Sequence, residues 1–355
     1  MFNVADVPVV GLDVGSSAVK MVSLDANGDG CHVIAAAMST IESVDGSEPS
    51  EGAAIAAIED CLKSSQGSIS RDSYFVFGLS GLKKVKISSF NFALLTLEEV
   101  SQAVMLEAAQ VCPFDVRSSV SVVDYQLIGT YEADGGGLRK RKGKVHPSVK
   151  GVLAVATKEA ISKRRKLAED TLLKCMLIDS DALALLNCLE KCLPSGEKLP
   201  IAVVNVGRSL TTVAILGADG LPFVRDLGYS GGDIIEHIAK SSNTSAEQVQ
   251  QRLSESKGTA DIDPACKRLI LDITETLAYY LASHGGNAIE RVYVCGGFSL
   301  FDDFVKSLAG GIESKVSVWN PFLQMHCDDN IAGGDLIKKC GPAFAVAAGL
   351  AMRQV

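Results

Sequence analysis

One motif occurs twice in this chain, and the duplication constrains the fold more than any other feature of the sequence. The segment LDVGSSAVKMVSLDANG (12–28) aligns without a gap with VNVGRSLTTVAILGADG (204–220), and six of the seventeen positions are identical. Each copy predicts a strand, a tight turn that begins with glycine (Gly15 or Gly207), a second strand and then an exposed turn. Two copies with the same pattern indicate that the chain contains two related halves.

The residues around the first turn favour a phosphate-binding site. A turn of glycine and small hydroxyl residues leaves backbone N–H groups free to surround a phosphate, and Lys20 would add positive charge there. An ionised aspartate is purely a hydrogen-bond acceptor, so Asp13 suits a hydrated Mg²⁺. Two such hairpins facing each other would hold a polyphosphate from both sides. The alternative is an ordinary pair of β-hairpins with glycine turns.

Two glycine pairs follow the hairpins along the chain. Gly231-Gly232 precedes an amphipathic helix, and Gly296-Gly297 lies between a strand and a helix that is expected to begin near Ser299. Glycine lets the backbone approach a ligand closely, and a helix N-terminus attracts an anion. A glycine pair is a weak signal by itself, and its position after the two hairpins makes it more specific.

The order of these motifs resembles the actin/Hsp70/hexokinase superfamily over nearly the whole chain. Within it, the chain is similar to the FtsA-like branch and most of all to the PilM family of type IV pilus assembly proteins. The similar segments are GLDVGSSAVKMV (11–22), the region 90–129 with its "DYQ" strand, the region 151–189, RDLGYSGGDIIEHIA (225–239), NPF (320–322) and GPAFAVAAGLAMR (341–353). The resemblance implies an α/β, actin/Hsp70/hexokinase-like two-lobed ATPase fold with an FtsA-like inserted subdomain.

The resemblance also implies a division of the chain. The expected parts are a first lobe (1–87) with the first phosphate hairpin, an inserted subdomain (88–157), a continuation of the first lobe (158–200), a second lobe (201–340) and a C-terminal helix that returns to the first lobe (341–355). Helical periodicity within this division predicts helices over 52–65, 97–111 and 263–285.

ATP and Mg²⁺ are the ligands that the resemblance implies, bound between the lobes. The expected nucleotide-binding residues are Asp13, Gly15, Ser16, Ser17, Lys20, Asn205, Gly207, Arg208, Ser209, Thr211, Gly231, Gly232, Gly296, Gly297 and Phe298. Asp13 and Asn205 are the expected Mg²⁺ ligands, through water. Asn205 departs from the Asp-Ile-Gly pattern of the family, and an asparagine keeps an oxygen acceptor but loses the charge. We therefore expect at most weak hydrolysis of ATP and assign no catalytic residue.

A membrane-protein partner is the second expectation from the family. The resemblance implies that the chain docks the cytosolic N-terminal tail of a PilN-like bitopic protein and lies at the cytoplasmic face of the inner membrane, with membrane contact only through that partner. The groove is expected where the inserted subdomain meets the first lobe, walled by Phe90, Phe92, Leu94, Leu95, Cys112, Pro113 and Phe114. The alternative is that these residues form the core of the subdomain. Self-association is left open.

Two other functions are weighed on the same fold. A sugar-type kinase or a fast ATPase would need a catalytic acid, for which Asp179 and Asp181 are the nearest candidates, although both also suit helix capping. A filament-forming protein of the FtsA type would need a C-terminal membrane-binding amphipathic helix. The C-terminal segment 341–353 is instead apolar and short, which is typical of a packed core helix.

Composition and charge exclude several other classes of protein. The formal net charge of −8 argues against broad nucleic-acid binding, and the apolar stretches fall short of the ~18 residues of a membrane helix. The N-terminus lacks the basic region of a signal peptide, which favours a cytosolic protein. The ten cysteines and five histidines show no metal-binding spacing. The basic runs 139–144 and 163–166 are each interpreted as solvated surface.

Overall fold

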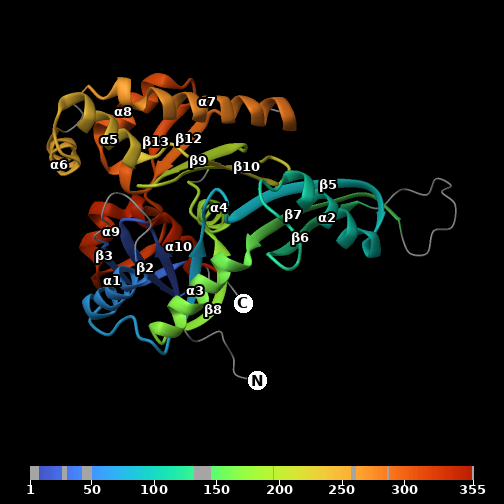
Figure 1. Ribbon diagram of the computed structural model, residues 1–355, viewed down its shortest axis with the longest axis horizontal. Coiled ribbons are helices and arrows are strands. Elements are labelled where there is room, and N and C mark those ends of the chain that lie inside the picture. The colour runs from blue at the N-terminus through green and yellow to red at the C-terminus, as the bar shows by residue number, and fades with distance from the viewer. Residues whose placement is uncertain are drawn as a thin grey trace.

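The computed structural model describes residues 8–25, 30–41, 50–131, 145–194, 196–256, 261–285 and 288–353. These residues form three β-sheets with helices packed on them (Figure 1). The expected turn residues 26–28 and residues 135–144 of the basic segment lie outside the described ranges. None of the helices in those ranges combines the length and the apolar character that crossing a bilayer requires.

The first sheet has six strands and carries the first copy of the motif. In spatial order the strands are β14 (His326–Ala332), β3 (His32–Thr40), β2 (Ala18–Asp25), β1 (Val9–Val14), β4 (Tyr74–Leu79) and β8 (Lys174–Ser180). The helices α1 (Glu51–Ser64) and α3 (Lys158–Asp170) cover one face. Leu12, Phe77 and Ile58 lie in the core that this packing buries. The apolar run before Asp13 is therefore a central strand.

The second sheet has five strands and carries the second copy. In spatial order the strands are β11 (Pro222–Leu227), β10 (Thr211–Leu216), β9 (Ile201–Val206), β12 (Arg291–Cys295) and β13 (Lys315–Val318). Its outer core is formed with α5 (Gly231–Ser242), α6 (Ala246–Ser256), α7 (Asp263–His284) and α8 (Asp302–Gly311). Pro264 in the first turn of α7 and Gly285 directly after it mark the ends that the sequence predicts.

Two helices lie between the sheets and join them in one core. α4 (Asp181–Lys191) contacts β4 of the first sheet and β10 of the second, and α10 (Ala345–Ala351) packs on α4, β1 and β2 (Figure 1). A Cβ atom at Gly349 would lie 1.9 Å from the carbonyl oxygen of Ala184. Glycine at this position lets the two helices approach at backbone distance.

A third, three-stranded sheet extends from the body (Figure 1). Its order is β5 (Val85–Thr96), β7 (Val145–Thr157) and β6 (Ser121–Tyr131). The helix α2 (Leu97–Val111) packs on it and begins with a capping box of Thr96 and Glu99. Phe90, Val104 and Leu153 belong to the separate core of this unit. It occupies the region where the sequence predicts the inserted subdomain.

One segment belongs to a different sheet from the one that the expected division of the chain assigns to it. Residues 326–332 fall within the expected second lobe (201–340), but as β14 they pair in parallel with β3 of the first sheet. The chain leaves the second sheet after β13 and passes through the short helix η3 (Pro321–Gln324) to reach that edge. The second lobe boundary at 340 is therefore wrong for this strand, because sheet pairing across the lobes carries no signal in the local sequence.

Candidate functional site between the two sheets

The two motif copies form turns of the same geometry. In the first, the Gly15 amide donates to the carbonyl of Ala18 at 3.0 Å, and in the second the Gly207 amide donates to Leu210 at 2.9 Å. The flanking pairs also correspond, since Val14 is opposite Val19 and Val206 is opposite Thr211. The duplication read from the sequence is thus present in three dimensions.

Both turns present backbone donors. Within the described ranges, the amides of Ser16, Ser17, Arg208 and Ser209 donate to no other protein group. Arg208 and Ser209 lie at the tip of the second turn, where Ser209 is exposed. Successive free N–H groups of this kind are suited to an anion.

Asp13 is paired with a lysine. Lys20 is its cross-strand neighbour, and the Nζ atom lies 2.8 Å from Oδ2 of Asp13 with both side chains nearly buried. The lysine therefore faces the carboxylate beside the first turn. Because Lys20 already occupies one carboxylate oxygen, a hydrated Mg²⁺ would share Asp13 with it.

Asp181 adds a second carboxylate to this site. It is the first residue of α4 and is partly buried, and within the described residues its buried Oδ1 atom has no hydrogen-bond partner. Burial and then the nearby Asp13 carboxylate raise the pKa of Asp181 to about 7. Asp179 has a different role, since Arg353 Nε lies 2.5 Å from its Oδ2 atom. The two acids that the sequence could not separate are therefore distinct, one inside the site and one in an ion pair.

Arg164 is a site residue that the sequence interpretation missed. The basic run 163–166 is expected to be solvated surface, but the Arg164 guanidinium turns inward and donates to the carbonyls of Gly78 (2.9 Å) and Val14 (3.1 Å). Burial lowers its pKa, and the acids Asp181 and Asp13 oppose this shift. The other three residues of the run form surface ion pairs. An inward arginine needs tertiary packing, which a run of like charges does not reveal.

Asn205 faces the second glycine pair. Gly296 has φ +88°, and a Cβ atom there would lie 2.4 Å from Oδ1 of Asn205. Next to it, the buried Thr212 hydroxyl donates to Asp226 at 2.6 Å. Glycine at position 296 thus allows the end of β12 to approach the side-chain amide of Asn205 at the end of β9. The helix expected near Ser299 is the short η2 (Gly297–Leu300), and α8 begins later, at Asp302.

The other expected second-lobe residues lie in a packed environment. The amides of Gly231 and Gly232 donate to the carbonyls of Gly207 and Arg208, at 3.0 and 2.9 Å. A Cβ atom at Gly231 would lie 2.5 Å from the ring of Phe298, which is itself a core residue. These contacts seat the N-terminus of α5 on the second turn. Thr211 is buried beside them, and within the described part of the chain its Oγ1 atom has no partner.

The expected peptide-groove residues divide into core and cavity. Phe90 is 3% exposed and stacks on Phe92 at 4.7 Å, so the ring serves the core of the subdomain. The partly buried residues Leu95, Cys112 and Phe114 pack against the same core. The side chain of Leu94 lies outside the described residues.

Pro113 differs from this group because it lines a cavity. The cavity of about 260 Å³ lies where the third sheet, the first sheet and the second sheet meet. Its apolar lining residues are Leu79, Leu82, Val85, Ile87, Val111, Pro113, Ala182 and Val224, and its polar ones are Ser80, Lys86, Ser180, Thr212, Arg225 and Asp226. Three exposed apolar residues of β6, Val122, Tyr125 and Ile128, also escaped the sequence interpretation.

The fold and the paired turns define the class of the protein. Solved structures of similar fold include a PilM–PilN type IV pilus biogenesis complex (24% identity, TM-score 0.78, 97% of this chain and 98% of that one). The ethanolamine utilization protein EutJ from Carboxydothermus hydrogenoformans (14%, 0.55, 97% and 88%) and the diol dehydratase-reactivating factor (10%, 0.51, 97% and 98%) are more distant. The chain has the actin-like ATPase fold.

The family follows from the sequence model that matches the chain. The model of the type IV pilus assembly protein PilM matches residues 11–355. The chain therefore belongs to the PilM family. The family and the fold that the ordered set of motifs resembles are both confirmed.

Proposed function

We propose that this protein is an ATP-binding adaptor of a type IV pilus machine that docks the cytosolic tail of a PilN-like membrane protein. The observation that carries the nucleotide part is the pair of matched turns, whose free amides adjoin Asp13 and Lys20 on one side and Asn205 on the other. Backbone donors and a carboxylate of this kind fit a polyphosphate with Mg²⁺.

The proposed residues are those of the two turns and their neighbours. Asp13 and Asp181 would hold Mg²⁺ through water, with Arg164 and Lys20 opposing the negative charge. The amides of the turns would bind phosphates. Gly296, Gly297 and the α5 end at Gly231 would shape the nucleoside side, with contacts to the ligand made by the backbone.

The test is thermal stability with and without Mg-ATP. A ligand that binds only the folded state adds about 2.7 kcal/mol at a hundredfold excess over Kd, so the melting temperature should rise. Gly15→Asp should abolish the rise, because it puts a carboxylate at the phosphate and its Cβ atom would lie 3.1 Å from Ala18 O. Gly52→Asp is the matched control, at an exposed site of α1 where a Cβ meets no atom within 4 Å. An unchanged melting temperature at millimolar Mg-ATP contradicts the proposal.

The partner part of the proposal concerns the cavity beside Pro113. The solved relative is a complex of PilM with PilN, and the cavity here lies at the junction of the third sheet with the first. A short extended tail would place apolar side chains against Leu82, which is 44% exposed, and Pro113. Such a partner would hold the protein at the cytoplasmic face of the inner membrane.

The experiment titrates a synthetic peptide, with the sequence of the cytosolic tail of a PilN-like protein, against the full chain. Leu82→Asp should weaken binding about 10- to 100-fold, since burying one leucine contributes about 1.5–3 kcal/mol. Leu106→Asp is the matched control, because Leu106 is an exposed leucine on α2 and does not line the cavity. If Tyr125→Asp on β6 weakens binding and Leu82→Asp does not, the cavity is the wrong site.

A further inference from the structure

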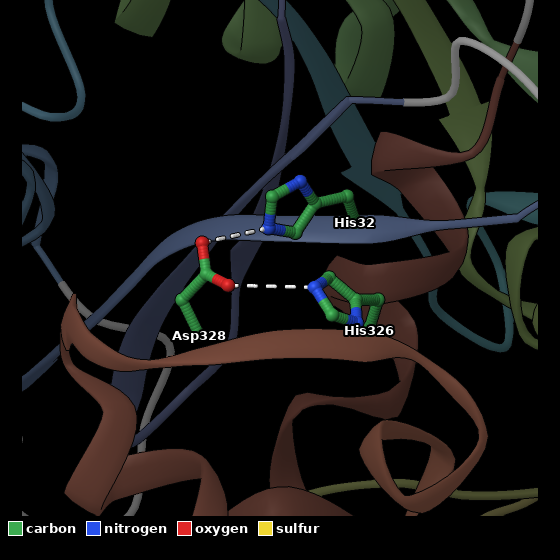
Figure 2. Close-up of side chains that lie close together, drawn as sticks. All are labelled: His32, His326 and Asp328. Carbon is green, nitrogen blue, oxygen red and sulfur yellow. Dashed lines mark hydrogen bonds and ion pairs between the residues drawn. The ribbon is translucent and has the colours of Figure 1, made fainter.

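Three side chains from distant parts of the sequence meet on the edge of the first sheet. His32 is the first residue of β3, and His326 and Asp328 belong to the edge strand β14 (Figure 2). Nε2 of His32 lies 3.2 Å from Oδ2 of Asp328, and Nε2 of His326 lies 3.4 Å from Oδ1. One carboxylate therefore faces two imidazole nitrogens.

The backbone pairing brings these residues together. In the parallel ladder His326 is directly opposite His32, and its amide donates to the carbonyl of Cys31 at 3.0 Å. Residues two apart in a strand share a face, so Asp328 lies on the same side as His326. The register shifts after Cys327, where β14 bulges before it pairs again at Ala332. The cluster is thus set by the ladder.

The spacing of the three groups fits a metal ion. Two ligands at about 2.0–2.1 Å from a tetrahedral ion lie about 3.4 Å apart. The two histidine–aspartate distances, 3.2 and 3.4 Å, already match this spacing. All candidate ligand atoms lie within 4.8 Å of one another. Bringing the two imidazole nitrogens to a separation of about 3.4 Å therefore requires a movement of at most about 1.4 Å.

We propose that His32, His326 and Asp328 bind one divalent transition-metal ion, with Zn²⁺ as the best match. Imidazole nitrogen is a poor ligand for Mg²⁺ but suits zinc, cobalt and nickel. Because the side chains are 41%, 72% and 64% exposed, water can complete the coordination. The residues differ from those of the nucleotide site and from those of the cavity, so this inference stands apart from the proposed function.

The position of the cluster indicates what the ion would stabilise. β14 enters the first sheet after the chain leaves the second sheet at β13 and passes through η3. A metal ion that bridges His326 and Asp328 to His32 would hold β14 against β3. Metal binding would therefore stabilise the connection between the two sheets.

The test uses the full chain without nucleotide. Calorimetric titration with Zn²⁺ should show one site that His326→Gln weakens at least about tenfold, since even indirect partners of a metal cost 10- to 100-fold in affinity. His32→Gln should have the same effect. His237→Gln is the matched control, an exposed histidine on α5 outside the cluster. Zn²⁺ should raise the melting temperature of the control but not of the two cluster variants.

Cobalt distinguishes this site from a thiol, because cysteine sulfur is also a zinc ligand and Cys175 is exposed. Bound Co²⁺ should give tetrahedral visible bands without sulfur charge-transfer absorption, and the bands should be lost in His32→Gln. If His326→Gln does not fold, Asp328→Asn provides the same comparison, with its exposed neighbour Asp329→Asn as control. A thiolate spectrum that is unchanged in the cluster variants, or Zn²⁺ affinity equal to that of the control, overturns the proposal.

Discussion

The buried carboxyl of Asp181 makes a quantitative prediction about stability and pH. Its pKa is raised from 3.8 to about 7 by burial and by the Asp13 carboxylate. The folded protein therefore binds a proton here that the unfolded chain has lost above pH 4. It follows that stability falls as the pH rises from about 4 to about 7. Asp181→Asn removes this contribution, so the variant should gain stability over the wild type as the pH rises.

The magnitude follows from the shift. Three pKa units correspond to about 4 kcal/mol at 1.36 kcal/mol per unit. Roughly 2–3 kcal/mol of this should develop between pH 5 and pH 8. The measured quantity is the difference in unfolding free energy between Asp181→Asn and the wild type at each pH. Taking this difference cancels the titration of those shared groups that do not interact with Asp181.

Urea unfolding followed by the fluorescence of Trp319 provides the assay, because this single tryptophan is buried in the core between the sheets. Asp302→Asn, at an exposed position of α8, removes the same formal charge and serves as the control. The reasoning is refuted if the variant and the wild type keep a constant stability difference across this pH range.

Two further substitutions test the motif and the packing of the lobes. Asn205→Asp restores the family residue, and we expect faster release of phosphate from ATP or a tighter dependence on Mg²⁺. If the wild-type protein already hydrolyses ATP at about 10 per second, the expectation of weak hydrolysis is contradicted. Gly349→Ala should lower the urea midpoint, because its Cβ atom would lie 1.9 Å from the carbonyl oxygen of Ala184. Relieving this clash costs about 1–3 kcal/mol of stability, which exceeds the roughly 1 kcal/mol that alanine gains over glycine in helix propensity. Gly52→Ala in the open first turn of α1 should raise it instead, and equal shifts for both would oppose the packing argument.

The sequence predicts well those features that neighbouring residues determine. The turns at Gly15 and Gly207 are closed by hydrogen bonds between residues three apart, so their residue types are sufficient to identify them. The ends of α2 and α7 follow from their capping residues in the same way. The two related halves and the family could be recognised because these local patterns recur in a fixed order.

Features that depend on distant parts of the chain could not be predicted. His32 and Asp328 are 296 positions apart and meet only through the pairing of β14 with β3. The inward orientation of Arg164 on α3 depends on the carbonyls of Gly78 in β4 and Val14 in β1. Residue type and spacing carry no information about any of these contacts.

The two copies of the motif differ in what they offer a ligand. Both keep the turn, but the pair Asp13–Lys20 of the first is replaced by Asn205–Thr212 in the second. On β11, Asp226 lies opposite Thr212, and its carboxylate accepts from the Thr212 hydroxyl. The two carboxylates of the proposed cation site, Asp13 and Asp181, lie in β1 and directly after β8 of the first sheet. We expect the first lobe to hold the metal and the second to contact phosphate through its backbone, so that closure of the lobes depends on the nucleotide more than on a shared ion.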